Sequence, residues 1–207
     1  MTRGKFITLE GGEGAGKSTQ LARLALHLRA GGHDVLTTRE PGGTAFAEAL
    51  RGVLVGDAAQ GVDPLAEALA HFAARADHVS RTIRPALEAG QHVLCDRFFD
   101  STFAYQVVAG GIDRRHFDTL RHAAIGDFRP DLTLVLDLPV ALGMARARDA
   151  NRYEALGAAF HERVRAAFRS LAETEPDRCV LIDAAADTDT VARAIASVVR
   201  ERLGIGP

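Results

Sequence analysis

Short apolar runs alternate along the chain with longer stretches in which apolar residues recur every three or four positions. The short runs have the length and composition of buried strands, and they predict strands at residues 6–9, 35–38, 92–95, 132–136 and 180–182. The periodic stretches predict helices at about 21–30, 44–55, 64–88, 101–108, 114–125, 141–148, 158–174 and 188–203, with a break in the third near Pro85.

The order of these elements predicts the class of fold. Strands that alternate with helices indicate parallel βαβ units, and apolar runs without polar alternation are typical of strands covered on both faces. We therefore expect a three-layer α/β/α fold with a parallel sheet of about five strands. Ligands of such sheets bind at the carboxyl ends of the strands, so functional residues are expected after Leu9, Thr38, Cys95 and Leu136.

Composition narrows the class of protein. A length of 207 residues, of which 47% are hydrophobic and 25% charged, fits one domain over residues 1–207. The net charge of −2 gives no sign of a nucleic-acid partner. The apolar runs are too short to cross a bilayer, and the first residues lack a signal-like apolar region, so we expect a cytoplasmic protein without a membrane partner. Cys95 and Cys179 lie in strand-like runs and are expected to be buried free thiols.

The segment GGEGAGKST lies between the first predicted strand and the first predicted helix. It matches the P-loop motif G-x-x-x-x-G-K-[ST], in which glycines let backbone N–H groups turn inward around a polyphosphate. The lysine can reach the β- and γ-phosphates, the hydroxyl can bind Mg²⁺, and the positive end of the helix points at the same anion. We expect a nucleoside triphosphate to bind Gly11, Gly12, Glu13, Gly14, Ala15, Gly16, Lys17, Ser18 and Thr19, with Lys17 catalytic and Ser18 on the metal.

This motif alone does not name the reaction, because switches, ATPases and small-molecule kinases share it. A guanine-specific switch normally carries N-K-x-D and D-x-x-G elements. Neither occurs, since the one asparagine, Asn151, is followed by Arg152 and no aspartate has a glycine three residues later. A kinase needs instead a second anion site, for its acceptor, close to the first.

Charged residues follow the second and third predicted strands, at the edge where a ligand is expected. Arg39 follows the second strand, and Asp96 with Arg97 follows the third. Guanidinium groups bind two phosphate oxygens in a fixed plane, which suits an acceptor phosphate. The carboxylates of Asp96 and Glu10 are candidates for holding Mg²⁺ directly or through water. A kinase is favoured, and a nucleotide-dependent switch or binding module is the alternative.

Five segments together resemble the bacterial thymidylate kinases, namely FITLEGGEGAGKST (6–19), TREPGGT (38–44), FAAR (72–75), DRFFDSTFAYQ (96–106) and GDFRPDLTLVLDLP (126–139). The first marks only a P-loop protein, whereas TREPGGT and DR-x-x-x-S-x-x-A-Y-Q together are specific to this family. The resemblance implies ATP-dependent phosphorylation of dTMP to dTDP with Mg²⁺, by a cytoplasmic homodimer. Another nucleoside monophosphate is the alternative acceptor.

The same resemblance implies roles for individual residues. Arg97 would bind the dTMP phosphate with support from Arg39, and Glu10 would lie near the 3′-hydroxyl and the metal. Phe72 would stack on thymine, unless the stacking ring is one residue earlier, and Arg75 would address a carbonyl of the base. The rest of the dTMP site would comprise Ser101, Thr102 and Gln106 around the base and Tyr105 against the sugar, where a 2′-hydroxyl would clash.

An arginine-bearing link, RDANRYE at residues 148–154, separates two predicted helices. In the bacterial type of this family a mobile lid supplies an arginine that the P-loop lacks, and this P-loop has Gly14 and Ala15 with no arginine nearby. We expect a short lid at about residues 146–157 that brings a catalytic arginine, Arg148 or Arg152, to the transferring phosphoryl group. Asn151 departs from the family pattern, which has an aspartate there.

Overall fold

A parallel sheet forms the centre of the fold. The computed structural model describes residues 3–146, 153 and 156–206. Its strands are β1 (Phe6–Gly11), β2 (Val35–Arg39), β3 (His92–Asp96), β4 (Leu132–Asp137) and β5 (Cys179–Asp183). They form a five-stranded parallel sheet in the order β2-β3-β1-β4-β5, so the predicted strands and the predicted sheet are confirmed.

Helices follow the strands at the expected places. The α-helices are α1 (Lys17–Ala30), α2 (Ala45–Val55), α3 (Pro64–His78), α4 (Arg84–Glu88), α5 (Phe99–Thr102), α6 (Arg114–Ile125), α7 (Val140–Arg146), α8 (Gly157–Thr174) and α9 (Thr188–Leu203). A short 3-10 helix, η1 (Asp57–Ala59), follows α2, and two π-helical segments, η2 (Val79–Ile83) and η3 (Phe103–Ala109), continue α3 and α5. The break expected near Pro85 lies just before it, in η2, because Pro85 has no N–H to donate to the preceding turn.

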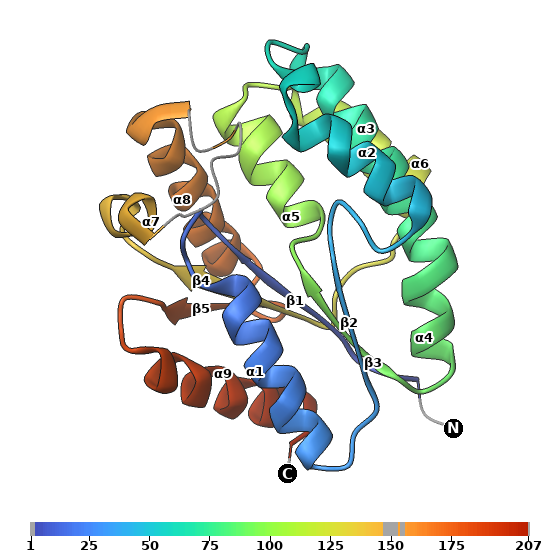
Figure 1. Ribbon diagram of the computed structural model, residues 1–207, viewed down its shortest axis with the longest axis vertical. Helices are drawn as coiled ribbons and strands as arrows, with labels where there is room; N and C mark the ends of the chain where they lie inside the picture. Colours follow the sequence, from blue (N-terminus) through green and yellow to red (C-terminus); the bar gives the residue numbers. More distant parts are fainter. Residues whose placement is uncertain (1–2, 147–152, 154–155, 207) are drawn as a thin grey trace.

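The helices cover both faces of the sheet and complete the predicted three-layer fold (Figure 1). On one face α1 and α9 lie side by side over apolar residues of the sheet, Leu9 and Leu134 among them. On the other face α4, α5 and α8 pack against the sheet, and a cluster rich in phenylalanine, including Phe6 and Phe98, fills part of this layer. Because β1 is central, every one of its residues is buried.

Strand register brings the predicted functional residues to one edge. Asp96 is paired with Arg39 of β2 on one side and with Leu9 of β1 on the other. Glu10 and Gly11, which open the P-loop, lie beside the end of β4. The loops after β1, β2 and β3 therefore meet at the carboxyl edge of the sheet, as expected for a ligand site in this class of fold.

A buried ion pair joins α5 to the chain just before β5. Arg178 donates from Nη1 and Nη2 to the two carboxylate oxygens of Asp100, at 2.7 and 3.0 Å, and both side chains are almost fully buried. Arg178 also donates to Oγ1 of Thr133 in β4 at 2.7 Å. Because α5 is a single turn, this ion pair fixes the position of Asp100, the residue that precedes Ser101.

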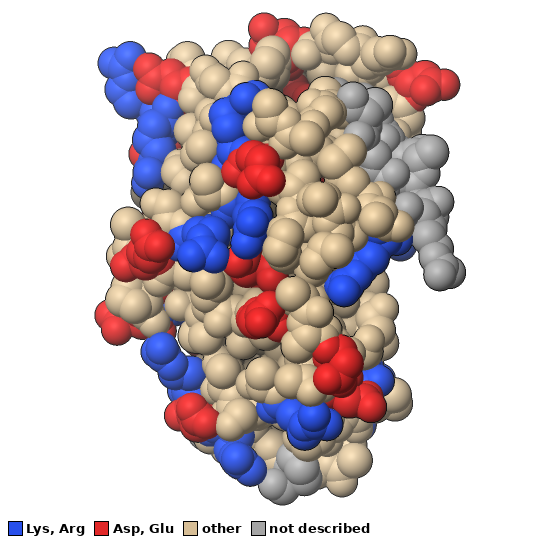
Figure 2. All heavy atoms as spheres, turned by 90° about the vertical axis from the view of Figure 1, so that its left-hand side faces the viewer, with Lys and Arg blue, Asp and Glu red and all other residues tan. Residues whose placement is uncertain are grey.

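Surface features add little to the functional picture. On the face seen in Figure 2, basic side chains are interspersed with acidic ones. Within the described parts of the chain, every helix is too short or too polar to cross a membrane. Cys95 and Cys179 are buried free thiols, which confirms that expectation.

Candidate active site

The P-loop takes the conformation that its glycines allow. It connects β1 to α1, and Gly14 has a φ of +68°, in the left-handed region that favours glycine. A Cβ at Gly14 would lie 2.1 Å from the carbonyl oxygen of Gly143 in α7, so a side chain is also excluded by space. The P-loop backbone is thus packed directly on the backbone of α7.

Lys17, the first residue of α1, points back over this loop. Its Nζ donates to the carbonyl oxygens of Gly11 and Gly12 at 3.2 and 2.7 Å. Burial, followed by the positive charge of Arg97, lowers the pKa of Lys17 to about 8. A buried ammonium held only by carbonyl groups is suited to binding an anion, because an anion would offset its cost of burial.

Ser18 and Asp96 form the part of the site that fits a metal. The Ser18 hydroxyl donates to Oδ2 of Asp96 at 2.5 Å, at the exposed mouth of the P-loop. Among the described residues, no group of three or more His, Cys, Asp or Glu side chains could hold a metal ion. Two protein oxygens completed by phosphate and water oxygens are an arrangement typical of Mg²⁺.

Glu10 lies deeper than its predicted role requires. Its side chain is fully buried, and its oxygens accept hydrogen bonds from the Phe98 N–H and the Ser101 hydroxyl, both at 2.6 Å. Burial and the nearby charge of Asp100 raise its pKa to about 8. The position does not support a direct contact with metal or sugar, and it makes Glu10 the anchor of the turn that carries Arg97 and Ser101.

Arg97 lies at the centre of the site. Its backbone has a φ of 69°, which is rare for a residue with a side chain and is characteristic of functional positions. Its guanidinium donates to Glu13 at 2.7 Å and to the carbonyl oxygen of Gly11 at 3.0 Å. Although burial alone would raise it, the charges of Arg97 and Lys17 lower the pKa of Glu13 to about 2, so Glu13 is a carboxylate at neutral pH.

A pocket opens next to the P-loop, and Arg97 forms part of its wall. Of the residues predicted to bind the acceptor, it is lined by Arg75, Arg97, Ser101, Thr102, Tyr105 and Gln106. It is also lined by His71, which is the alternative stacking position one residue before Phe72, and by Glu13 of the P-loop. The remaining lining residues are ones for which the sequence indicated no role, namely Glu40, Pro41, Arg51, Val55, Phe98 and Tyr153. Glu40 and Pro41 belong to the TREPGGT segment, a signal that was available. The helix-borne residues carried no such signal.

Two predicted residues do not reach this pocket. Phe72 is 2% exposed and packs edge-on against Phe117, with 5.6 Å between the ring centroids, whereas His71 lines the pocket. One residue is about 100° of rotation on a helix, so the two side chains face different ways. Arg39 is exposed and pairs with Glu48 at 3.1 Å. The positions of Phe72 and Arg39 therefore do not support direct contact with a ligand in the pocket.

Arg75 is held rigidly in the pocket wall. Its Nε donates to Glu40 at 2.6 Å and its Nη2 to Thr102 at 3.2 Å. The rings of Phe72 and Phe98 lie 4.8 and 5.2 Å from its guanidinium carbon. Its Nη1 is buried and has no hydrogen-bond partner within the described chain. A buried donor without a partner is costly, and a ligand acceptor in the pocket would satisfy it.

The predicted lid lies largely outside the described residues. Arg148 and Arg152 both fall there, as does most of the segment 146–157. Helix α7 ends at Arg146, whose Nη1 donates to the carbonyl oxygen of Ala184 at 3.2 Å.

Comparison with known proteins gives a consistent result. Residues 9–195 match a family model described as thymidylate kinase. The chain is 53% identical over 208 residues to a thymidylate kinase of Caulobacter vibrioides, with 99% of this chain and 100% of that one covered. It is 48% identical to one of Afipia carboxidovorans, with 97% and 91% covered. The crystal structure of thymidylate kinase from Ehrlichia chaffeensis superposes with a TM-score of 0.79 and 36% identity, covering 95% of this chain and 99% of that one.

Proposed function

Since the chain belongs to the thymidylate kinase family and catalyses the ATP-dependent phosphorylation of dTMP to dTDP, we propose that ATP binds its P-loop and dTMP the adjoining pocket. The observation that carries this proposal is the position of Arg97, which contacts Gly11 of the P-loop and lines the pocket. One guanidinium at this boundary can hold the acceptor phosphate beside the terminal phosphate of ATP. Phosphoryl transfer requires that adjacency.

On the donor side, phosphate oxygens would replace the carbonyl groups of Gly11 and Gly12 as partners of Lys17. Near neutral pH Lys17 carries its proton, because its pKa is about 8. Ser18 and Asp96 would hold Mg²⁺ together with phosphate and water oxygens. When bound, this ion would neutralise part of the negative charge of the phosphates.

On the acceptor side, the dTMP phosphate would take over the Arg97 donor that now contacts Glu13. The unpartnered Nη1 of Arg75 would donate to a carbonyl oxygen of thymine. His71 supplies a ring in the wall at the alternative stacking position, and burial lowers its pKa, so the ring is uncharged at neutral pH. Tyr105 would lie against the sugar, since its hydroxyl is held by Glu13 at 2.8 Å.

In the reaction, a phosphate oxygen of dTMP attacks the γ-phosphorus of ATP, the bond to the β,γ-bridging oxygen breaks, and ADP leaves. Lys17 and Arg97 would stabilise charge on the oxygens around the transferring group. We propose that Arg148 or Arg152, from the predicted lid, supplies the remaining positive charge and that closure excludes water.

A cytoplasmic homodimer is proposed on the family resemblance and on one surface feature. Large apolar side chains are about half exposed on neighbouring helices, Phe46 and Val53 on α2 and Leu69 on α3. Apolar groups exposed together in this way are typical of subunit interfaces. Light scattering after size exclusion tests the proposal, and a monomeric mass at micromolar concentration would contradict it.

ADP production with MgATP and each of dTMP, dUMP, ribosyl TMP, dCMP, AMP and GMP tests the function. A strong preference for dTMP is expected. A preference for another monophosphate would keep the kinase and overturn the assignment of the pocket, while ADP production independent of any acceptor would overturn both.

A further inference from the structure

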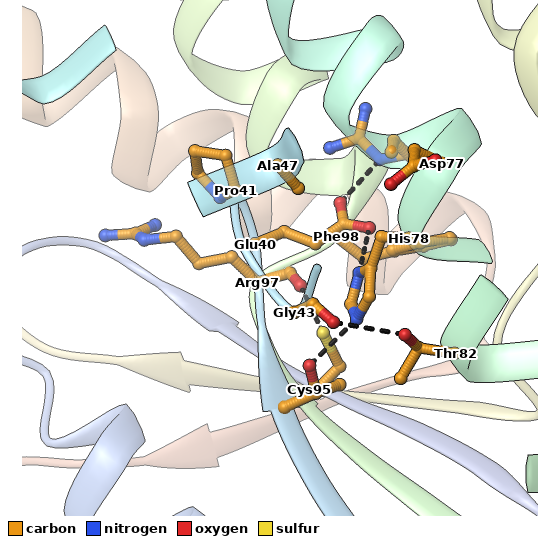
Figure 3. Close-up of polar contacts among 12 residues, drawn as sticks. Glu40, Pro41, Gly43, Ala47, Asp77, His78, Thr82, Cys95, Arg97 and Phe98 are labelled. Carbon is orange, nitrogen blue, oxygen red and sulfur yellow. Dashed lines mark hydrogen bonds and ion pairs between the residues drawn. The ribbon is translucent and has the colours of Figure 1, made fainter. Parts of the chain in front are cut away.

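His78 is a buried histidine beside the acceptor pocket that the phosphoryl transfer does not use. It is the last residue of α3 and is 0% exposed. Its Nδ1 lies 3.0 Å from Oε1 of Glu40, and its Nε2 lies 2.8 Å from Oγ1 of Thr38. Figure 3 shows the ring of His78 directed at the Glu40 carboxylate, with Gly43 beside it.

The chemistry of these contacts defines which nitrogen carries the proton. Glu40 is paired with Arg75 and, as a carboxylate, can only accept hydrogen bonds. Nδ1 of His78 must therefore be a donor to Glu40. In the neutral ring Nε2 is then an acceptor, and the Thr38 hydroxyl is its donor. Each polar atom of the ring thus has a partner of matching type.

The turn after β2 is shaped around this ring. Gly43 has a φ of +84°, and a Cβ there would lie 2.2 Å from Nε2 of His78 and 2.7 Å from Oγ1 of Thr38. Its carbonyl oxygen accepts a hydrogen bond from Thr82 at 3.1 Å, which closes the turn over the histidine. A glycine here allows the backbone to pack directly on His78.

The contacts continue from His78 to the pocket. One oxygen of Glu40 is held by His78 and the other by Nε of Arg75, so the carboxylate cannot rotate without losing one of them. With Thr102 on Nη2, the plane of the Arg75 guanidinium is set, and with it the direction of the unpartnered Nη1. Outer partners of this kind orient the groups that touch a ligand.

We propose that His78 is a positioning residue that, through Glu40, aims Nη1 of Arg75 at the base and thereby makes the enzyme prefer a pyrimidine with a carbonyl at ring position 4 over one with an amino group. The proposal rests on the assignment of the pocket to dTMP. An N–H donor at a fixed position satisfies the carbonyl of thymine or uracil. Opposed to the amino group of cytosine, the same donor is left unpaired, which is the stronger form of discrimination.

The test compares kcat/KM for dTMP, dUMP and dCMP in the full-length enzyme with MgATP. In His78→Leu the ratio of dTMP to dCMP should fall on the order of tenfold, as is common when an outer partner is lost, while the ratio of dTMP to dUMP stays the same. His78→Asn, whose amide nitrogen can replace Nδ1 as donor to Glu40, should restore most of the discrimination. These ratios are independent of the fraction of enzyme that is folded, so a merely structural role would leave them unchanged.

Two further variants and a control separate the role of His78 from the assignment of the pocket. Arg75→Gln tests the pocket assignment itself, and Thr38→Val removes only the hydroxyl behind His78, which should lower the dTMP to dCMP ratio more weakly. His92→Leu is the matched control, since His92 is a half-buried histidine at the opposite end of the sheet whose Nδ1 accepts a hydrogen bond from Lys5.

If Arg75→Gln loses discrimination and His78→Leu keeps it, the positioning role of His78 is wrong and the pocket assignment stands. If Arg75→Gln keeps the ratio, the base-reading role of Arg75 is wrong and the proposal for His78 falls with it. Equal losses in His78→Leu and His78→Asn would also overturn the proposal, because the donor to Glu40 would then be irrelevant.

Discussion

Arg97 and Glu13 form an ion pair of 2.7 Å between the turn after β3 and the P-loop, and both side chains line the acceptor pocket. The pair joins the donor half of the site to the acceptor half. A carboxylate oxygen on a guanidinium that is expected to bind phosphate is a negatively charged acceptor, as a phosphate oxygen would be. We therefore expect Glu13 to hold the Arg97 guanidinium at the boundary between the P-loop and the pocket until dTMP binds.

Replacing Arg97 with alanine should cost about 2–4 kcal/mol of transition-state stabilisation, measured from the fall in kcat/KM for dTMP. The acceptor phosphate would then be unpaired in a largely buried site. Steady-state kinetics with saturating ATP measures the loss. Arg114→Ala is a suitable control, since Arg114 is exposed, pairs with Asp118 one helical turn away and otherwise lies over the ring of Phe103, outside the pocket. Wild-type kinetics in Arg97→Ala would exclude Arg97 as the phosphate-binding residue.

Lys17 should impose a pH dependence on ATP binding. Its pKa is lowered to about 8 by burial, so in the free enzyme its charge is present below that pH and is lost above it. We expect kcat/KM for ATP to fall about tenfold per unit above about pH 8, whereas kcat falls at a higher pH because bound phosphate favours the charged form. Lys17→Arg should show lower activity without this decline, since guanidinium keeps its proton. A flat profile of the native enzyme to about pH 9.5 would contradict the prediction.

Ser18→Ala should raise the concentration of Mg²⁺ needed for half-maximal activity. The hydroxyl lies 2.5 Å from Asp96 and is one of two oxygens expected on the metal. Loss of one ligand oxygen should cost on the order of tenfold in apparent metal affinity, whereas KM for dTMP should change little. A titration of activity against free Mg²⁺ decides the matter, and an unchanged midpoint would place the metal elsewhere.

Arg178→Leu should destabilise the fold by about 3–5 kcal/mol, because Asp100 would be left as a buried, unpaired charge. Urea unfolding followed by circular dichroism measures the change. A double variant, Asp100→Asn with Arg178→Met, should recover much of the loss since no isolated charge remains. Arg114→Leu, at an exposed pair, should cost less than about 0.5 kcal/mol. If Arg178→Leu cost as little as this control, the buried pair would be unimportant for stability.

Most of the fold follows from local pattern. Strands in a sheet covered on both faces are short and mostly apolar, and β1 and β4 are buried along almost their full length. The π-helical segments were not predicted beyond the break near Pro85. Their extra residue per turn depends on how α3 and α5 pack against neighbouring elements, and no sequence period reports it.

Most of the residues predicted to bind the acceptor line the pocket, on helices as well as after a strand, whereas Arg39 and Phe72 do not. Arg97 and Asp96 could be placed because parallel strands end at one edge. Arg51, Val55 and His71 reach the pocket only because α2 and α3 pack over it, which is a long-range result. Phe72 does not line the pocket, whereas the predicted alternative one residue earlier, His71, does, because neighbouring residues on a helix point about 100° apart.

Gly14 and Gly143 meet backbone to backbone, and a Cβ at Gly143 would itself lie 2.4 Å from the carbonyl oxygen of Glu13. Each position is therefore closed to substitution from both sides, while exposed neighbours on α7 such as Leu142 and Met144 have room to change. A library that randomises residues 12–16 and 140–146 should return glycine at 14 and 143 and tolerate change at exposed neighbours. Because their backbones are in direct contact, a shift of the strand-to-helix turn proposed to bind ATP would be passed to α7, the helix after which the predicted lid begins.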